Sequence, residues 1–178
     1  NYASTELLDN DLSFLKNKKN QQFCDAINNQ RISTKSLVES LDSIKGCELM
    51  IIGDVIIDQY SACEAVGVSA EAPVIVVKEL ETKNFLGGAA IIASHIKALG
   101  AKPTLISILG ADEIGSRAIQ ELDNDKIKHF LIEDNERPTT LKKRYVVENQ
   151  KVFRVSKLED KSIPVEIENK LIELIEKK

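Results

Sequence analysis

The spacing of hydrophobic positions changes near residue 46 and divides the chain into two parts. Residues 1–46 are rich in Asn, Gln, Ser and Lys, and their apolar positions recur three and four residues apart, the spacing of one helical face. Ser33 or Thr34 can cap the last helix of this part. We interpret the part as a helical linker without chemistry of its own. Three short helices are predicted, marked by Leu7, Leu8, Leu12 and Leu15, by Phe23 and Ile27, and by Leu37, Leu41 and Ile44.

From residue 47 onward, unbroken apolar runs alternate with amphipathic stretches, which is typical of α/β proteins. Short apolar runs suit strands that are covered on both faces, and the stretches between them suit the helices of β-α-β crossovers. We therefore predict a parallel sheet with helices on its faces. The predicted strands cover residues 48–53, 103–109 and 128–132, and the predicted helices cover 88–99, a stretch capped by Asp112, and 165–176 after Pro164.

Two extended excursions interrupt this alternation, and they predict a small second sheet outside the main one. In residues 60–86 the first part is extended, and the rest resembles two strands around a turn near 81–83. In residues 139–155 two strands flank a turn at 148–151. A flap of this kind can cover a ligand at the strand ends.

Composition and charge exclude several classes of function. The net charge is −4, the isoelectric point is near 5.4, and aromatic residues make up only 4% of the chain. These values indicate neither a positively charged surface nor a set of aromatic side chains on which bases could stack, so we expect neither nucleic acid nor a membrane as a partner. No apolar run approaches the length of a membrane span. The cysteines are too widely spaced for a zinc site, and without a signal-like segment they indicate a reduced, cytoplasmic protein with no intrinsic metal.

Two features stand where open α/β sheets bind ligands, at the carboxyl ends of the strands. Asp54 and Asp58 follow the first predicted strand, four residues apart. We expect Asp54 to cap a turn and Asp58 to take part in recognition. Gly87 and Gly88 open the next helix, where they either make a tight turn or let main-chain N–H groups approach a ligand.

Seven ordered pieces of sequence resemble one family of enzymes. In this order and spacing they are similar to the first half of a ribokinase-type carbohydrate kinase of the PfkB family, and most of all to heptose-phosphate kinases, including the kinase half of bifunctional heptose kinase/adenylyltransferases. The resemblance implies an α/β, ribokinase-like fold with a parallel sheet and a small β-sheet lid over residues 47–178. The pieces are Ile52-Gly-Asp-Val-Ile-Ile-Asp-Gln-Tyr60, Ser69-Ala-Glu-Ala-Pro-Val-Ile-Val-Val-Lys78, Leu86-Gly-Gly-Ala-Ala90, Ala98-Leu-Gly-Ala101, Gly110-Ala-Asp-Glu113, Pro138-Thr-Thr-Leu-Lys-Lys-Arg144 and Asn149-Gln-Lys-Val-Phe-Arg154.

The resemblance implies a sugar site beneath a lid that residues 60–86 and 139–155 form. Asp58 would accept hydrogen bonds from sugar hydroxyls, and the main chain at Gly87 and Gly88 would reach the same sugar. In this family the lid often also pairs subunits, which implies a homo-oligomer. The side chains implied to hold the phosphate of a sugar phosphate are Lys142, Arg144 and Arg154, with Asn149 as a polar partner.

The same resemblance implies that catalysis needs more than this stretch of chain. The family's Gly-Ala-Gly-Asp segment, which supplies the catalytic base, lies in the second half of the kinase domain, as does most of the ATP site. We therefore expect no catalytic residue in this chain and no turnover by the chain alone. ATP and Mg²⁺ are implied as cofactors of the complete kinase only.

Two departures from the family pattern keep a second interpretation open. Ile91 stands where the family typically has an Asn that hydrogen-bonds the sugar, and Gly67 stands where related kinases usually carry Arg. The alternative is a non-catalytic dimerisation or regulatory module derived from such a kinase. Residues 1–46, in turn, are either an ordinary capped helical segment or the tail of an upstream nucleotidyltransferase domain, which some related kinases carry.

Overall fold

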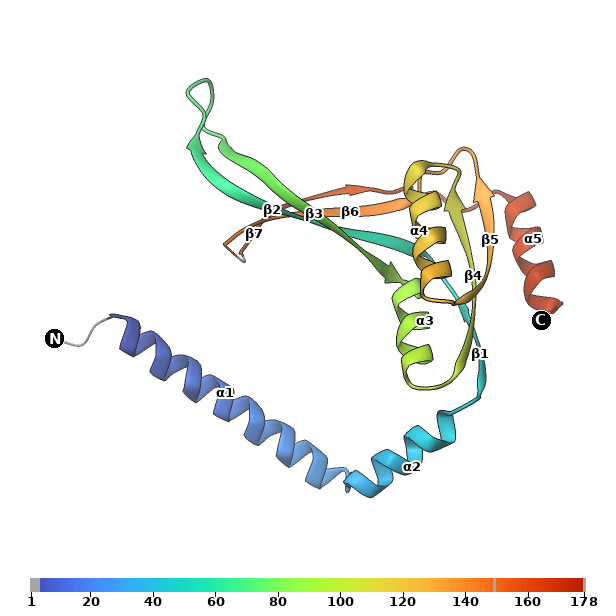
Figure 1. The fold of residues 1–178 in the computed structure, drawn as a ribbon, viewed down its shortest axis with the longest axis horizontal. Coiled ribbons are helices and arrows are strands. Elements are labelled where there is room, and N and C mark those ends of the chain that lie inside the picture. Colours follow the sequence, from blue (N-terminus) through green and yellow to red (C-terminus); the bar gives the residue numbers. More distant parts are fainter. Residues whose placement is uncertain (1–3, 149, 178) are drawn as a thin grey trace. The chain divides into compact units, whose positions relative to one another are not determined.

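The computed structural model describes residues 4–148 and 150–177, with side chains from residue 16 onward, and the chain divides into two compact units. Unit 1, Asn1–Lys45, contains the helices α1 (Ser4–Asn29) and α2 (Thr34–Ile44) (Figure 1). The prediction of two helices before residue 30 is wrong, because α1 is continuous. No Gly or Pro interrupts residues 4–29, so the polar run near its middle has no residue that would break the helix.

The start of α2 matches the predicted cap. The hydroxyl of Ser33 accepts a hydrogen bond from the N–H of Ser36, and the hydroxyl of Ser36 accepts one from the N–H of Ser33. This reciprocal pair satisfies two of the donors that a helix leaves unpaired at its first turn. Ser33 is therefore the capping residue, and Thr34 is the first residue of the helix.

Unit 2, Gly46–Lys178, is built around a parallel sheet, here called sheet A. The crossovers between its strands pass through α3 (Ala89–Ala98) and α4 (Glu113–Asn124), which lie on one side of the sheet, while the last helix lies on the other side (Figure 1). The predicted cap at Asp112 and the predicted α/β class are confirmed, and the last helix begins directly after Pro164, as expected. In chain order the elements are β1 (Glu48–Ile52), α3 (Ala89–Ala98), β4 (Lys102–Gly110), α4 (Glu113–Asn124), β5 (Lys128–Asp134) and α5 (Val165–Glu176), with sheet order β1-β4-β5.

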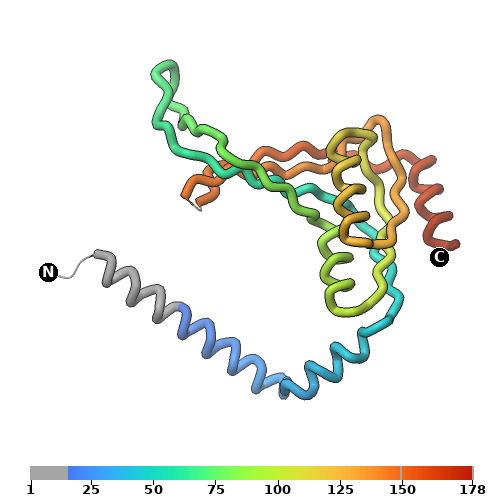
Figure 2. The backbone as a smooth tube through the Cα atoms, viewed as in Figure 1, coloured from blue at the N-terminus to red at the C-terminus, as the bar shows by residue number. Residues whose placement is uncertain are grey.

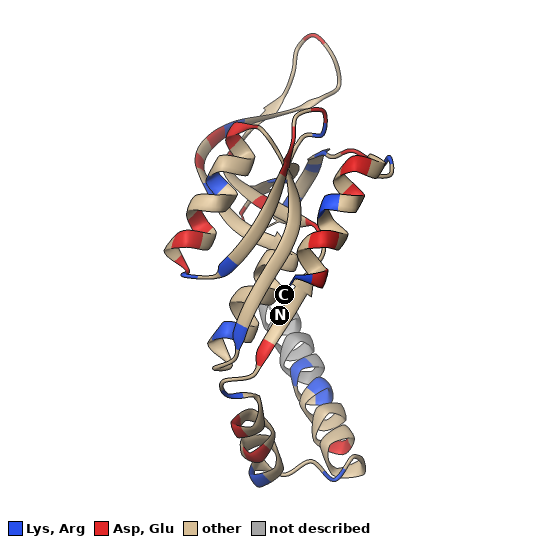
Figure 3. Cartoon of the chain, turned by 90° about the vertical axis from the view of Figure 1, so that its right-hand side faces the viewer, with Lys and Arg blue, Asp and Glu red and all other residues tan. Residues whose placement is uncertain are grey.

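The core lies between sheet A and the helices α3 and α4. Leu105 and Leu109 project from the central strand toward the small residues of α3, which allow that helix to approach the sheet closely. Acidic and basic residues are interspersed along α4 and α5 (Figure 3). The buried residues of the core cluster are Val55, Ile57, Ala89, Ala90, Ala93, Leu105, Leu109, Ala118, Leu122 and Ile127.

The predicted second sheet is confirmed and is called sheet B. Two antiparallel hairpins are joined in its middle by parallel pairing of β2 with β6, and Figure 2 shows them running together away from sheet A. The four strands are β2 (Val55–Val68), β3 (Ile75–Gly88), β6 (Thr140–Val147) and β7 (Gln150–Lys157), in the order β3-β2-β6-β7.

The predicted turn near residues 81–83 is wrong, because these residues lie inside the single long strand β3. Glu81 is paired with Ala62, and Lys83 is paired with Tyr60. Four consecutive polar residues, 81–84, resembled a turn, but residues 81–83 are all exposed within the strand, so both faces of the strand can carry polar side chains there. The hairpin turns instead at residues 69–74, where the N–H of Ser69 donates to the carbonyl of Val74.

Candidate sugar-binding site

One face of sheet B gathers most of the residues that the sequence suggested for binding. Asp58 of β2 lies opposite Lys142 of β6, Tyr60 lies opposite Arg144, and Arg144 lies opposite Arg154 of β7. Residues paired in this way project from the same face of a sheet, and so do residues two apart on one strand. The pairing therefore brings one carboxylate and three cations, from three strands, to a common surface.

Asp58 and Arg144 form an ion pair at the centre of this surface. A guanidinium nitrogen of Arg144 donates to Oδ1 of Asp58, and the two side chains are 17% and 27% exposed for arginine and aspartate respectively. The hydrogen bond to Asp58 raises the pKa of Arg144, against the opposing effect of burial. The same guanidinium lies 5.2 Å from the ring centroid of Tyr60, a cation–π contact. The aromatic ring thus supports the arginine from one side while Asp58 fixes its head group.

The glycine pair is required by its surroundings. Gly88 has φ of 59° and caps α3, and a Cβ at this position would lie 2.2 Å from the carbonyl oxygen of Asp54. A Cβ at Gly87 would lie 2.7 Å from Oδ2 of Asp58. The main chain of β3 therefore runs directly against the candidate carboxylate. Gly88 therefore enters α3 with a left-handed φ that suits glycine, and Gly87 brings the main chain of β3 close to Asp58. The approach of this pair to a ligand stays a prediction.

A hollow of about 660 Å³ opens on this face, and most of its lining is apolar. Asp58 contributes a carboxylate, and Ile91 contributes an aliphatic side chain from the first turn of α3. Gly67, the other departure from the family pattern, lies far along β2 at a bulge, with no atom within 4 Å of where its Cβ would stand. The residues that line the hollow are Asp58, Tyr60, Ala62, Glu81, Lys83, Phe85, Leu86, Ile91 and Val146.

Two of the predicted cations keep their charge available. In the part of the chain that the structure describes, neither Lys142 nor Arg154 forms an ion pair, whereas Arg144 is engaged by Asp58. Arg154 is exposed and faces Arg144 across the β6–β7 ladder, an arrangement of like charges that favours an anion between them. The predicted polar partner Asn149 lies outside the described residues.

Sequence reasoning missed the two aromatic side chains of the site. Tyr60 and Phe85 meet edge to face, with ring centroids 5.8 Å apart, and both line the hollow. Tyr60 stands two residues after Asp58, so strand alternation alone places it on the same face. Phe85 could not be found in this way, because its position depends on the register between β2 and β3.

Among the described residues, neither a metal-binding cluster nor a membrane-spanning helix is found. No group of three or more His, Cys, Asp or Glu side chains within residues 16–148 and 150–177 is arranged to hold a metal ion. In the same part of the chain, no helix is both long and apolar enough to cross a bilayer.

Comparison with known proteins identifies the family. The profile of the pfkB family carbohydrate kinases matches residues 47–175. A D-beta-D-heptose 7-phosphate kinase of Bordetella bronchiseptica is 40% identical over 114 residues, which are 64% of this chain and 36% of that protein. The bifunctional protein HldE of Campylobacter jejuni is 37% identical over 131 residues, which are 74% of this chain and 27% of that protein.

Solved structures support the same fold at lower identity. A protein from Staphylococcus aureus provisionally assigned as a phosphofructokinase superposes with a TM-score of 0.58 at 17% identity, covering 74% of this chain and 40% of the other. A protein from Clostridium perfringens provisionally assigned as a sugar kinase gives a TM-score of 0.54 at 18% identity, covering 73% of this chain and 41% of the other. The chain thus spans well under half the length of the relatives it matches. With its ribokinase-like sheets and a family match over residues 47–175, the chain belongs to the pfkB family of carbohydrate kinases.

Proposed function

We propose that this chain is the sugar-binding and lid portion of a cytoplasmic, ATP-dependent kinase that phosphorylates a sugar phosphate of the heptose class. The observation that carries the proposal is the shared face of sheet B, where Asp58 lies beside the glycine main chain and opposite a set of cations. Relatives named as heptose 7-phosphate kinase and HldE support the substrate class.

The proposed sugar contacts come from the start of β2 and the end of β3, which lie side by side at the open end of one hairpin. Asp58 has two carboxylate oxygens, and a carboxylate can accept hydrogen bonds from two neighbouring hydroxyls. The absence of a Cβ atom at Gly87 keeps the main chain free of a side chain beside that carboxylate, where the sugar would lie against Gly87 and Gly88. A pyranose or furanose with adjacent hydroxyls fits this arrangement, because two hydroxyls can donate to the two oxygens of Asp58 while the ring lies near the glycine main chain.

The proposed phosphate contacts come from the other hairpin. Arg154 and Lys142 have no ion-pair partner among the described residues, and they flank Arg144 on the same face. A phosphate is held well by guanidinium and ammonium groups from two or three directions. A substrate with a hydroxyl-rich ring at Asp58 and a phosphate at Arg154 would span β2 to β7.

We also propose that this stretch does not complete the phosphoryl transfer by itself. The chain spans 36% of the length of its heptose 7-phosphate kinase relative, and we assign no catalytic base within it. In the complete kinase, ATP with Mg²⁺ supplies the phosphoryl group. The residues of this chain bind the acceptor sugar, orient its hydroxyl and cover it from water.

Calorimetric titration of the chain with a heptose phosphate and with the unphosphorylated heptose tests the binding site. Asp58→Asn is expected to weaken both ligands on the order of tenfold, because an amide accepts fewer hydroxyl hydrogen bonds than a carboxylate. Arg154→Gln is expected to weaken only the phosphorylated sugar, by a similar factor. Lys102→Gln, at the opposite end of sheet A, is the matched control. Equal binding of the two sugars by the unaltered chain would refute the phosphate assignment.

Turnover measurements test the incomplete-kinase proposal. The chain incubated with ATP, Mg²⁺ and a heptose phosphate is expected to release no ADP above the rate without sugar. Sugar-dependent ADP release would contradict the assignment of the base to another part of the protein.

A second function is favoured by the apolar character of the hollow. Phe85 is 52% exposed there and Ile91 replaces the expected amide, so the face also suits a dimerisation or regulatory module that pairs two copies of sheet B. Sedimentation distinguishes the two functions. A dimer that Phe85→Glu dissociates, in a chain that binds no sugar phosphate, would favour the module.

A further inference from the structure

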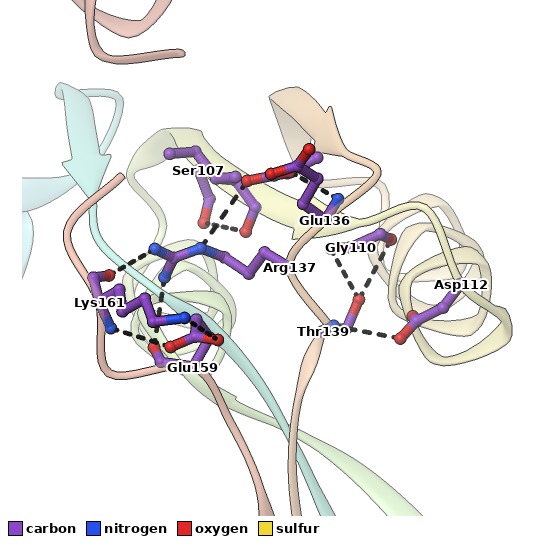
Figure 4. A network of polar contacts seen from close by, with 10 residues as sticks. Ser107, Gly110, Asp112, Glu136, Arg137, Thr139, Glu159 and Lys161 are labelled. Carbon is purple, nitrogen blue, oxygen red and sulfur yellow. Dashed lines mark hydrogen bonds and ion pairs between the residues drawn. The ribbon is translucent and has the colours of Figure 1, made fainter. Parts of the chain in front are cut away.

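The connections between the two sheets converge on the second half of β4. On one side, the hydroxyl of Ser107 donates to the carbonyl of Gly53, 2.6 Å away, where the chain passes from β1 to β2. On the other side, Gly110 and Asp112 contact the start of β6 (Figure 4). Sheet B therefore has two supports: a glycine-rich one for the β2–β3 hairpin and a polar one for the β6–β7 hairpin.

The first part of the polar support is a set of hydrogen bonds around Thr139, which is 1% exposed. Its hydroxyl accepts from the N–H of Gly110 at 3.0 Å and donates to the carbonyl of Gly110 at 3.2 Å. Its own N–H donates to Oδ2 of Asp112, while Oδ1 of Asp112 caps α4 at Gly115. Lys157, the last residue of β7, lies 3.7 Å from the same carboxylate. One aspartate thus joins the helix to both strands of the hairpin.

The second part is Arg137, which bridges the two loops that enter and leave the hairpin. Its guanidinium donates to the carbonyl of Lys161 at 2.6 Å and to that of Glu159 at 3.4 Å (Figure 4). Its Nε lies 3.9 Å from a carboxylate oxygen of Asp134, which is itself 6% exposed and accepts a hydrogen bond from the N–H of Glu136. The side chain therefore ties residues 135–139 to residues 158–164.

The main chain on either side of this bridge is closely packed. A Cβ at Gly110 would lie 2.4 Å from the carbonyl oxygen of Arg137, and one at Gly115 would lie 2.9 Å from the hydroxyl of Thr139. Arg137 is only 20% exposed, and its buried Nε has no hydrogen-bond partner among the described residues. A buried arginine left with one unsatisfied donor is costly, so the two carbonyl contacts must outweigh that cost.

We propose that Arg137 is a positioning residue that fixes the angle of the β6–β7 hairpin, and with it the whole of sheet B, over the carboxyl ends of sheet A. The hairpin carries Lys142, Arg144 and Arg154, whereas Asp58 belongs to the other support. Because the strands of sheet B are hydrogen-bonded to one another, loss of the bridge loosens the whole sheet at one of its two supports, while the support of the β2–β3 hairpin remains. The consequence for ligand affinity rests on the proposed function, but the bridge itself does not.

Amide hydrogen exchange of the full chain tests the bridge. In Arg137→Gln, exchange is expected to rise on the order of tenfold at the N–H groups of Glu136, Thr139 and Lys161 together, while the amides of β4 stay within about twofold. Arg137→Lys, which keeps one charged donor, should restore part of the protection. Arg117→Gln, which removes an exposed arginine that pairs only within α4, is the control. Unchanged exchange at Lys161, or an equal rise throughout β4, would overturn the proposal.

Spin labels on sheet B and on α4 test the positioning role directly. With the native cysteines replaced and labels placed at Lys78→Cys and Glu121→Cys, Arg137→Gln is expected to broaden the distance distribution, and Arg117→Gln to leave it unchanged. If heptose phosphate binds, Arg137→Gln should also weaken it. If neither the unaltered chain nor any variant binds a sugar phosphate, the proposed function is refuted. The amide exchange rates and the spin-label distances still test the role of Arg137 in that case. A distribution of unchanged width would refute the positioning role.

Discussion

The two oxygens of Asp58 have different neighbours, and this asymmetry governs how the carboxylate can act. Oδ1 accepts the hydrogen bond from Arg144, whereas Oδ2 is the atom that a Cβ at Gly87 would meet. Under the proposed function, a sugar hydroxyl would donate to Oδ2, the oxygen that Arg144 does not engage. The ion pair fixes the orientation of the carboxylate, which lowers the entropy that binding must remove.

The glycine pair gives a contrast between two alanine substitutions. Gly88→Ala is expected to destabilise the chain by at least about 1–3 kcal/mol, because it combines a left-handed φ with a Cβ against the rigid carbonyl of Asp54. Gly87→Ala meets only the movable carboxylate of Asp58, so it should cost less stability but impair sugar binding. Urea unfolding followed by circular dichroism measures the first effect, and calorimetric titration the second. Equal losses of stability in the two variants would contradict this distinction.

Asp112 gives a prediction about pH. Burial acts to raise its pKa, but hydrogen bonds from Gly115 and Thr139, with the charge of Lys157, outweigh burial and lower the pKa below its ordinary 3.8. The carboxylate therefore stabilises the folded state above about pH 4, and this contribution is lost as the pH falls through the lowered value. The difference in unfolding free energy between the unaltered chain and Asp112→Asn should shrink from about pH 6 to about pH 2.5. A difference that stays constant over urea titrations in this range would refute the role.

At the scale of elements, local signals identified α4, α5 and the strands of sheet A, but not the continuity of α1 or β3. Asp112 caps α4 through its side chain, and Pro164, whose ring fixes φ and removes a donor, stands immediately before α5, so one residue marks each start. β3 was misjudged because its continuity depends on pairing with β2 across the sheet. The Asp58–Arg144 pair is still less visible in sequence, because its partners are 86 residues apart and meet only through the parallel register of β2 and β6. Family resemblance suggested the cations, but their position on one face of sheet B could be seen only from the pairing of β2 with β6 and of β6 with β7.

The connection between β1 and β2 depends on one hydroxyl of β4. Ser107→Ala removes the donor to the carbonyl of Gly53 and the acceptor for the N–H of Val55, and both main-chain groups lie in a buried region. We expect a loss of about 1–3 kcal/mol in unfolding free energy, because buried polar groups are left unpaired. Ser116→Ala, which removes an exposed hydroxyl bonded within α4, should change stability by less than about 0.5 kcal/mol. Urea unfolding compares the two, and similar losses would sink the argument.

At the scale of the whole molecule, the described part of sheet A has one uncovered apolar region. β1 lies at the edge of the sheet, and α5 packs on β4 and β5 rather than on β1. Met50 and Ile52 consequently remain 39% and 49% exposed on that side. Parallel strands are normally buried on both faces, so we expect this surface to be buried against another copy of the chain or against further polypeptide.

Sedimentation of the 178-residue chain tests this cover. We expect the chain to associate with rising concentration, and Ile52→Glu to reduce the association because a carboxylate would be placed on the uncovered face. Phe85→Glu, on sheet B, is the comparison: it should reduce association only if the copies pair through sheet B rather than through sheet A. A monomer over the whole accessible concentration range would contradict the prediction.

The parallel pairing of β2 with β6 also constrains the order of folding. Each hairpin of sheet B closes locally, but the ladder between them joins strands whose residues are separated by the whole of α3, β4, α4 and β5. Closing so large a loop is entropically slow, and contacts of high sequence separation form late in mixed α/β proteins. On the ribosome, the β2–β3 hairpin would be made long before its partner and would wait with one edge unpaired. The central ladder of sheet B is therefore the step at which synthesis of this chain is most exposed to mispairing with its neighbours.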